Sequence, residues 1–200
     1  MMRTSFLALA LLAILSLTNS CQLYQNPLTD RPSKDINTWL LGVWEYEDEA
    51  GKTYRIGVMP LTADRLTIWG REMGSSKTVK YEAWISRVGS SKFLSMKSLT
   101  STKEIPEGTF VFLHYQVIDQ THVVARGLQL DSPEDASSKA LRREVRAKLE
   151  DRTLLPDQGS TWTRISEVYW QAGEDPLAQP MIPPRFPPEP PLVPLEVAPE

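Results

Sequence analysis

The stretch that decides the fold is residues 78–97, TVKYEAWISRVGSSKFLSMK. Its first half places apolar side chains at alternate positions, namely Val79, Tyr81, Ala83 and Ile85. Alternation with a period of two is typical of a strand with one buried face, and the Gly-Ser-Ser sequence at 89–91 suits a tight turn. The stretch therefore predicts an antiparallel hairpin with strands at 78–88 and 92–97.

Segments of the same kind continue on both sides of this hairpin, at residues 43–47, 53–59, 65–72, 109–118 and 121–130. Seven strands joined by short turns favour an antiparallel up-and-down meander, and residues 161–165 can add a short last strand. We therefore predict a mainly β fold. Its core is a barrel of about seven to eight antiparallel strands, within a domain that spans residues 36–170.

A single helix is predicted at 133–151, after the meander. Ser132 is a favourable N-cap residue, and Pro133 suits the first helical position. Leu141, Val145 and Leu149 recur at a spacing of four and form one apolar stripe. Because the strand at 109–118 is apolar on both faces, we expect the helix to cover the outer face of that strand.

The net charge and the cysteine content make some functional and structural classes of protein less favourable. Removal of a leader at 1–20 takes away Arg3 and leaves 21 basic against 25 acidic residues, a balance that disfavours nucleic-acid binding. A single cysteine allows no internal disulfide. The helix arginines Arg142, Arg143 and Arg146 are interpreted as a solvated face, with contact to anionic lipid headgroups as the alternative.

The first twenty residues have the layout of an export signal peptide. Arg3 precedes an apolar run at 6–15, which is shorter than the roughly 20 residues that a transmembrane helix needs. Cys21 follows directly and resembles the acceptor cysteine of bacterial lipoproteins. That resemblance implies thioether lipidation and acylation (palmitate) of Cys21, and a protein held on a membrane of the bacterial cell envelope, with the outer membrane or the periplasmic face favoured. An ordinary secretory leader is the alternative, because Thr18-x-Ser20 suits cleavage at the same bond.

Two flanks differ from the domain in composition. Residues 21–35 are polar with two prolines, and we expect them to form a lipidated, flexible tether. Residues 171–200 are proline-rich, with ten prolines in the last 25 positions. The spacings Pro184-x-x-Pro187 and Pro191-x-x-Pro194 permit docking of this tail to the aromatic groove of a protein partner. An extended or self-packed terminus is the favoured alternative.

The domain resembles the lipocalin-like (calycin) barrels through Gly42-Val43-Trp44, preceded by the turn-like segment 38–41, and through Arg126 near the end of the meander. The resemblance implies that Arg126 lies across Trp44 and that Gly42, Trp44 and Arg126 close one end of the barrel. More loosely, residues 40–165 resemble uncharacterised bacterial domains with a GxWxYxDExGKxYR opening, and that resemblance implies no activity.

No catalytic residue, metal ligand or cofactor site is predicted. His114 and His122 have no second histidine or cysteine at ligand spacing, and no serine lies in a G-x-S-x-G motif. The carboxylates at 45–49 are interpreted as a solvated hairpin end, with calcium binding as the alternative. A hydrolase would require His114 to lie beside a serine and an acid.

Four residues are candidate ligand or partner contacts: Trp69, Trp84, Phe112 and His114. Trp69 and Trp84 fall on the polar side of their strands, which favours packing against the helix or the tail, with a partner patch as the alternative. If the faces are inverted, both tryptophans line a pocket. Phe112 is bulky enough to fill the barrel, and His114 shares its face.

The sequence thus supports two functions. The first is a non-enzymatic, membrane-anchored envelope lipoprotein whose barrel holds a small apolar ligand. The alternative is an interaction or structural lipoprotein that uses the outer face of the barrel and the proline-rich tail. A barrel of about eight strands is just wide enough to be filled by its own side chains or to hold one small ligand, so the interior volume distinguishes the two.

Overall fold

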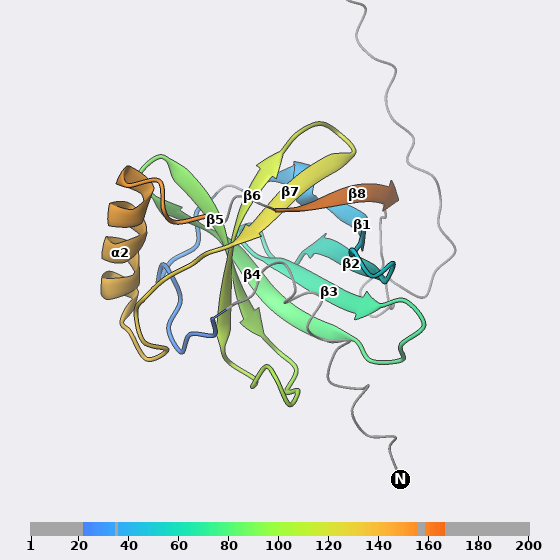
Figure 1. Ribbon diagram of the computed structural model, residues 1–200, viewed down its shortest axis with the longest axis horizontal. Helices are drawn as coiled ribbons and strands as arrows, with labels where there is room; N and C mark the ends of the chain where they lie inside the picture. Colours follow the sequence, from blue (N-terminus) through green and yellow to red (C-terminus); the bar gives the residue numbers. More distant parts are fainter. Residues whose placement is uncertain (1–21, 35, 156–158, 167–200) are drawn as a thin grey trace, which may run out of the picture.

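The computed structural model describes residues 22–34, 36–155 and 159–166. It has a closed, antiparallel, up-and-down barrel in which each strand pairs with its sequence neighbours and β8 pairs with β1 (Figure 1). The strands are β1 Gly42–Glu47, β2 Thr53–Pro60, β3 Leu66–Glu72, β4 Val79–Val88, β5 Ser91–Ser98, β6 Phe110–Val117, β7 His122–Gly127 and β8 Ser160–Ser166. A 3-10 helix, η1 Thr38–Leu40, precedes β1, and one α-helix, α2 Ser138–Glu150, lies between β7 and β8.

The predicted fold class is confirmed. All seven expected strands are present, the short last strand completes the barrel, and the architecture is compatible with a lipocalin-like fold. The main difference is that β7 ends at Gly127 and not at Leu130. Leu128 still donates its N–H to the carbonyl of Phe112, at 3.1 Å, but Leu128 and Leu130 then turn into the core beneath the helix.

The barrel closes where β1 meets β8, and Gly42 lies at this seam. Its φ of +125° is a backbone conformation that favours glycine. A Cβ atom built at this position would lie 2.7 Å from the carbonyl oxygen of Ser166 in β8. Glycine therefore permits the close approach of the two strands.

The first core lies inside the barrel. Along β4, the inward side chains of Val79, Tyr81, Ala83 and Ile85 are all buried, as the alternation predicts. Leu40 of η1 belongs to the same inner core, so the 3-10 helix contributes to the packing before β1 begins. Ile105, from the connection between β5 and β6, also packs into this core.

A second core lies on the outside of β4, β5 and β6. It contains Trp84, Phe93, Phe110 and Phe112 from the sheet, together with Leu141 and Val145 from α2. In Figure 1, α2 lies on one side of the barrel, with the blue N-terminal segment beside it. This arrangement explains why the strand at 109–118 is apolar on both faces.

The helix begins five residues later than expected. Its N-cap is Ser137, whose hydroxyl accepts a hydrogen bond from the N–H of Ala140 at 3.3 Å. Ser132 instead donates its hydroxyl to Glu144, and the N–H of Ala136 bonds to the carbonyl of Pro133 in a separate turn. The cap motif at 132–135 therefore starts a turn and not the helix, whereas the predicted helix end is correct within one residue.

The prediction of a flexible tether is wrong for residues 22–34, which we call the strap. Tyr24 forms an antiparallel bridge with Phe110, and Ser33 donates its N–H to the carbonyl of Ile85 at 2.8 Å. Tyr24 and Leu28 are 2% and 0% exposed. Burial of such a side chain stabilises a protein by about 1.5–3 kcal/mol, so the strap is part of the folded domain.

The signal peptide, Cys21 and the proline-rich tail lie outside the described residues. Within the described part of the chain, α2 is too short and too polar to cross a bilayer, and no other helix has the required length and apolar character.

Candidate functional site

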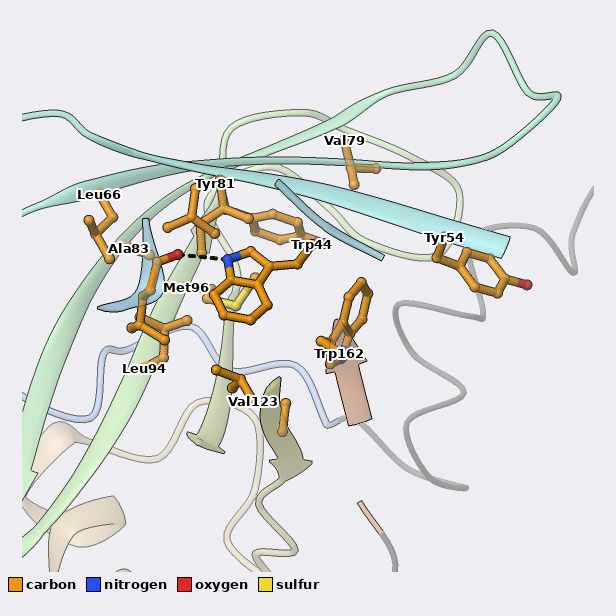
Figure 2. Close-up of a cluster of buried hydrophobic side chains, with 14 of the residues drawn as sticks. Trp44, Tyr54, Leu66, Val79, Tyr81, Ala83, Leu94, Met96, Val123 and Trp162 are labelled. Carbon is orange, nitrogen blue, oxygen red and sulfur yellow. Dashed lines mark hydrogen bonds between the residues drawn. The ribbon is translucent and has the colours of Figure 1, made fainter. Parts of the chain in front are cut away.

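The inner core of the barrel contains a partly open apolar cavity of about 70 Å³. Every strand contributes to its wall. The lining residues are Leu40, Trp44, Ile56, Val58, Ile68, Gly70, Tyr81, Leu94, Met96, Leu113, Tyr115, Val123, Ala125 and Trp162. Several of these side chains surround the indole of Trp44 in Figure 2, and Trp162 faces it from β8.

The surface of the wall is almost entirely apolar, and its side-chain polar groups are the hydroxyls of Tyr81 and Tyr115 and the indole N–H groups of Trp44 and Trp162. The indole N–H of Trp44 already donates to the carbonyl of Leu40 at 2.8 Å, so it is satisfied inside the protein. Burial raises the pKa of the Tyr115 hydroxyl, which keeps that group neutral. None of the fourteen lining residues is charged at neutral pH. The cavity therefore offers dispersion contacts and exclusion of water, which suit binding of an apolar group.

Small and large side chains line the cavity together. Gly70 and Ala125 line the cavity beside Trp44 and Trp162, and a pair of small residues leaves space that the indoles do not fill. Towards the β1–β2 hairpin the interior is packed, because the rings of Tyr46 and Trp162 lie 5.3 Å apart and Tyr54 is fully buried. The barrel is thus filled at some levels and open at others.

The cation over Trp44 is Arg164, and the expectation that Arg126 takes this place is wrong. The guanidinium carbon of Arg164 lies 4.6 Å from the centre of the Trp44 ring, and the side chain also donates to the carbonyl of Trp39 in η1. Arg126 follows Ala125, which faces the cavity, so alternation directs Arg126 outward, where its side chain lies close to Gly159. The matching residue on β8 was not recognised from the sequence, although Trp162 and Arg164 alternate with exposed Thr161 and Thr163.

The four candidate contact residues lie outside the cavity wall. Trp84 and Phe112 are 5% and 2% exposed within the outer core, where Phe112 stacks on Tyr24 at 5.1 Å. The proposal that Phe112 fills the barrel is therefore wrong. Trp84 packs beneath the helix, as the favoured interpretation predicts.

Trp69 and His114 also point outward. The ammonium nitrogen of Lys80 lies 4.5 Å from the ring centre of Trp69, and the indole N–H of Trp69 is buried with no hydrogen-bond partner among the described residues. His114 lies 5.8 Å from the ring of Phe93. Burial, and then the charge of Arg126, lower the pKa of His114, which favours its neutral form.

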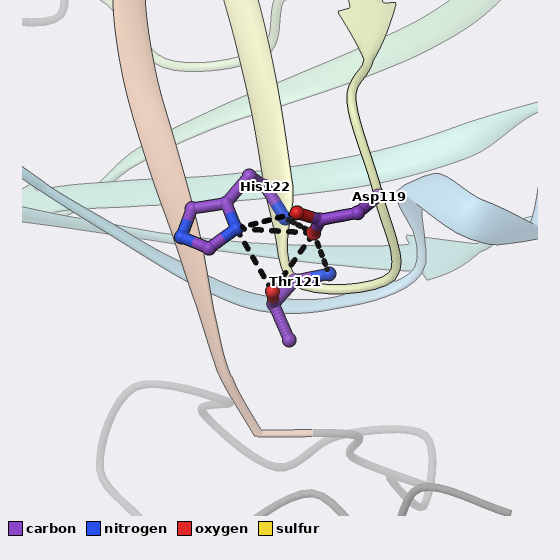
Figure 3. Close-up of polar contacts among 3 residues, drawn as sticks. All are labelled: Asp119, Thr121 and His122. Carbon is purple, nitrogen blue, oxygen red and sulfur yellow. Dashed lines mark hydrogen bonds and ion pairs between the residues drawn. The ribbon is translucent and has the colours of Figure 1, made fainter. Parts of the chain in front are cut away.

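The second histidine belongs to a small polar cluster in the turn between β6 and β7 (Figure 3). Nδ1 of His122 lies 3.0 Å from Asp119 and 2.9 Å from the hydroxyl of Thr121. In a catalytic triad the acid and the nucleophile bond to opposite ring nitrogens, whereas here both contact Nδ1. Asp119 also accepts hydrogen bonds from the backbone N–H groups of Thr121 and His122. These bonds stabilise the conformation of the turn.

The acidic hairpin end between β1 and β2 has a similar structural role. Asp48 accepts hydrogen bonds from the N–H groups of Ala50 and Lys52, both at 2.9 Å, and from the hydroxyl of Tyr54. These bonds lower the pKa of Asp48. Within residues 22–34, 36–155 and 159–166, no group of three or more histidine, cysteine or carboxylate side chains is arranged to hold a metal ion.

Comparisons with known proteins assign no family. No family model matches the chain, and neither a curated protein nor a solved structure matches it significantly. The function is therefore inferred from the residues and the geometry alone.

Proposed function

We propose that the protein is a non-enzymatic, membrane-anchored envelope lipoprotein whose barrel binds a small apolar ligand. The observation that carries the ligand proposal is the uncharged cavity inside the barrel. A buried cavity lined by apolar side chains stays dry and takes up apolar guests, because a water molecule in it would lack hydrogen-bond partners.

The cavity volume limits the size of the ligand. An apolar protein cavity that binds benzene has a volume of about 150 Å³, roughly twice that of the cavity in this barrel. The best candidates are therefore slim groups, such as a short alkyl chain, or a small ring accommodated by rotation of flexible Met96. Large flat ligands are disfavoured.

The ligand proposal is tested with a variant that fills the cavity. Ala125→Leu adds bulk to the wall, whereas Thr163→Leu adds a similar side chain at an exposed position on neighbouring β8. Binding of benzene and of short-chain alcohols is followed by the fluorescence of the lining tryptophans or by NMR. We expect saturable binding that Ala125→Leu abolishes and Thr163→Leu preserves. Equal binding by all three proteins would overturn the proposal.

The anchor proposal is supported by the leader and by Cys21, the only cysteine of the chain. Two acyl chains hold a protein stably on a bilayer, whereas one does not. Cys21→Ser should therefore move the protein from the membrane fraction to the soluble fraction. A mature protein whose intact mass corresponds to an unmodified Cys21 would contradict the anchor.

A protein-interaction function is the second candidate. It is favoured by three exposed apolar side chains at one end of the barrel. They are Trp39 in η1, Leu61 after β2 and Ile118 after β6, which are 47%, 51% and 54% exposed. Their replacement by serine should abolish partner capture but leave uptake of small apolar probes unchanged. The opposite result would favour the ligand-binding function.

A further inference from the structure

The outward face of α2 carries a stripe of cations. Lys139, Arg143 and Arg146 are exposed, and spacings of four and three residues place them on one side of the helix. The opposite side is held against the sheet by Leu141 and Val145, which are fully buried. The orientation of the stripe is therefore fixed by packing.

The acidic residue in the middle of the helix does not neutralise the stripe. Glu144 accepts hydrogen bonds from the N–H groups of Asp131 and Ser132 and pairs with Lys148 at 3.5 Å. Lys148 in turn lies 2.9 Å from Asp131. These contacts satisfy the carboxylate on the side of the helix that faces Asp131 and Ser132.

The three cations of the stripe make no ion pair and no hydrogen bond within the part of the chain that the structure describes. Arg142, which lies beside the stripe, pairs with Asp30 of the strap at 3.7 Å. Exposed acidic residues flank the stripe: Glu150 follows it a turn later, and Glu134 and Asp135 precede the helix. Within α2 itself the cations still outnumber the carboxylates, although the mature chain is acidic.

The strap brings the site of the anchor close to this helix. The N–H of Gln25 donates to the carbonyl of Glu134 at 2.8 Å, and the side chain of Asn26 donates to the carbonyls of Asp135 and Ala136. Cys21 precedes Tyr24 by three residues, which span at most about 11 Å. In the proposed anchored form, chain length therefore keeps the acyl anchor within about 11 Å of Tyr24, next to the residues that bond to the segment before α2.

We propose that the stripe formed by Lys139, Arg143 and Arg146 lies on the anionic surface of the membrane that holds Cys21. This inference rests on the proposed anchor for its location. Clustered lysine and arginine residues near a bilayer are attracted to acidic headgroups, and they act together with acyl chains as a second membrane signal. The barrel would then lie sideways on the membrane, with α2 against the headgroups.

The test uses the mature chain with Cys21→Ser, so that acylation does not contribute. Its binding to vesicles of equal parts phosphatidylglycerol and phosphatidylcholine is compared with binding to pure phosphatidylcholine vesicles. The stripe variant carries Lys139→Glu, Arg143→Glu and Arg146→Glu. The control variant carries Lys34→Glu, Lys77→Glu and Lys103→Glu, which change the net charge equally at exposed positions outside α2. Circular dichroism checks the fold, and Arg143→Glu alone replaces the triple variant if the latter unfolds.

We expect measurable, salt-sensitive binding to the anionic vesicles only, with a loss of about tenfold or more in the stripe variant and a much smaller loss in the control. Equal losses in both variants, or no binding to anionic vesicles by the parent chain, would overturn the inference. Tighter binding to RNA or to an acidic protein than to the vesicles would assign the stripe to another partner and overturn it as well. An unmodified Cys21 overturns the anchor alone, because the vesicle assay does not depend on lipidation.

Discussion

The inner and outer cores share strands β4, β5 and β6 but differ in how they are filled. In the outer core, aromatic rings are in close contact, with Tyr24 and Phe112 at 5.1 Å and Trp84 and Phe110 at 5.8 Å. In the inner core, Trp44 and Trp162 line a cavity together with the small residues Gly70 and Ala125. The outer face of the sheet is thus closely packed, whereas the interior of the barrel keeps open space.

The two cores also differ in buried polar groups. In the outer core, the hydroxyls of Thr29, Ser86 and Ser95 form a chain with distances of 2.8 and 2.7 Å. This chain connects the strap to β4 and β5. In the wall of the inner cavity, the indole N–H of Trp44 bonds to the backbone carbonyl of Leu40. Hydrogen bonds between side chains therefore fix the strap against the sheet, whereas the cavity is defined mainly by the shapes of its apolar side chains.

The largest expected effect is a difference in the stability cost of alanine substitution at two neighbouring residues on β5. Phe93 is fully buried in the outer core, and Leu94 lines the inner cavity. Phe93→Ala should lower the free energy of unfolding by about 3–5 kcal/mol. Leu94→Ala should cost about 2 kcal/mol, because its side chain already borders empty space and makes fewer contacts. Urea denaturation measures both, and a cost at Leu94 equal to that at Phe93 would contradict the comparison.

The next effect tests whether the strap belongs to the outer core. Leu28→Ala should lower the free energy of unfolding by about 2–3 kcal/mol, because Leu28 is fully buried in the strap. Gln25→Ala, at an exposed position of the same segment, should change it by less than about 0.5 kcal/mol. Chemical denaturation of both variants provides the measurement. If Leu28→Ala is as neutral as Gln25→Ala, the strap is only loosely held.

A smaller effect concerns the end of the inner core. A double-mutant cycle of Trp44→Leu and Arg164→Met should show a coupling of about 1 kcal/mol, because the guanidinium lies on the ring. The cycle of Trp44→Leu with Arg126→Met is the control and should be additive within about 0.5 kcal/mol. Coupling to Arg126 and none to Arg164 would reverse the assignment of the cation.

The smallest expected effect is a pH dependence at the edge of the outer core. Since burial lowers the pKa of His114 below its ordinary value of 6.5, the unfolded chain binds more protons than the folded chain just below that pH. The contribution of His114 to stability is therefore present above pH 6.5 and is lost as the pH falls through the pKa of the folded state. His114→Gln should flatten the fall in thermal midpoint between pH 7 and 5. Parallel curves for the parent protein and for His114→Gln would argue against it.

The strands were predictable because alternation is a local signal. Tyr81, Ala83 and Ile85 need only a period of two to be assigned to one face. The packing of the strap was not predictable from the sequence. Its two buried residues, Tyr24 and Leu28, lie among polar residues and prolines and follow no periodic pattern. Their burial depends on packing in the outer core with residues of α2 and β6, which lie far along the chain. A local pattern does not contain this information.

Site residues were harder to predict for the same reason. Arg126 and Arg164 both stand near strand ends, and only the pairing of β8 with β1 brings Arg164 onto Trp44. Phe112 lies on a strand with two apolar faces, so alternation alone gives two equivalent assignments for it. The cavity depends on the volumes of side chains from all eight strands. Its presence therefore cannot be predicted from any single segment of the sequence.

The most direct test of the central claim is a crystal structure of the protein under xenon pressure, because xenon enters apolar cavities. The account predicts xenon inside the barrel, in contact with Trp44, Leu94 and Ala125, and none between α2 and the outer face of the sheet. An interior without xenon, or with xenon found only among Phe93, Phe112 and Leu141, would contradict it. The outer core would then be the region with free space, and the barrel would be filled by its own side chains.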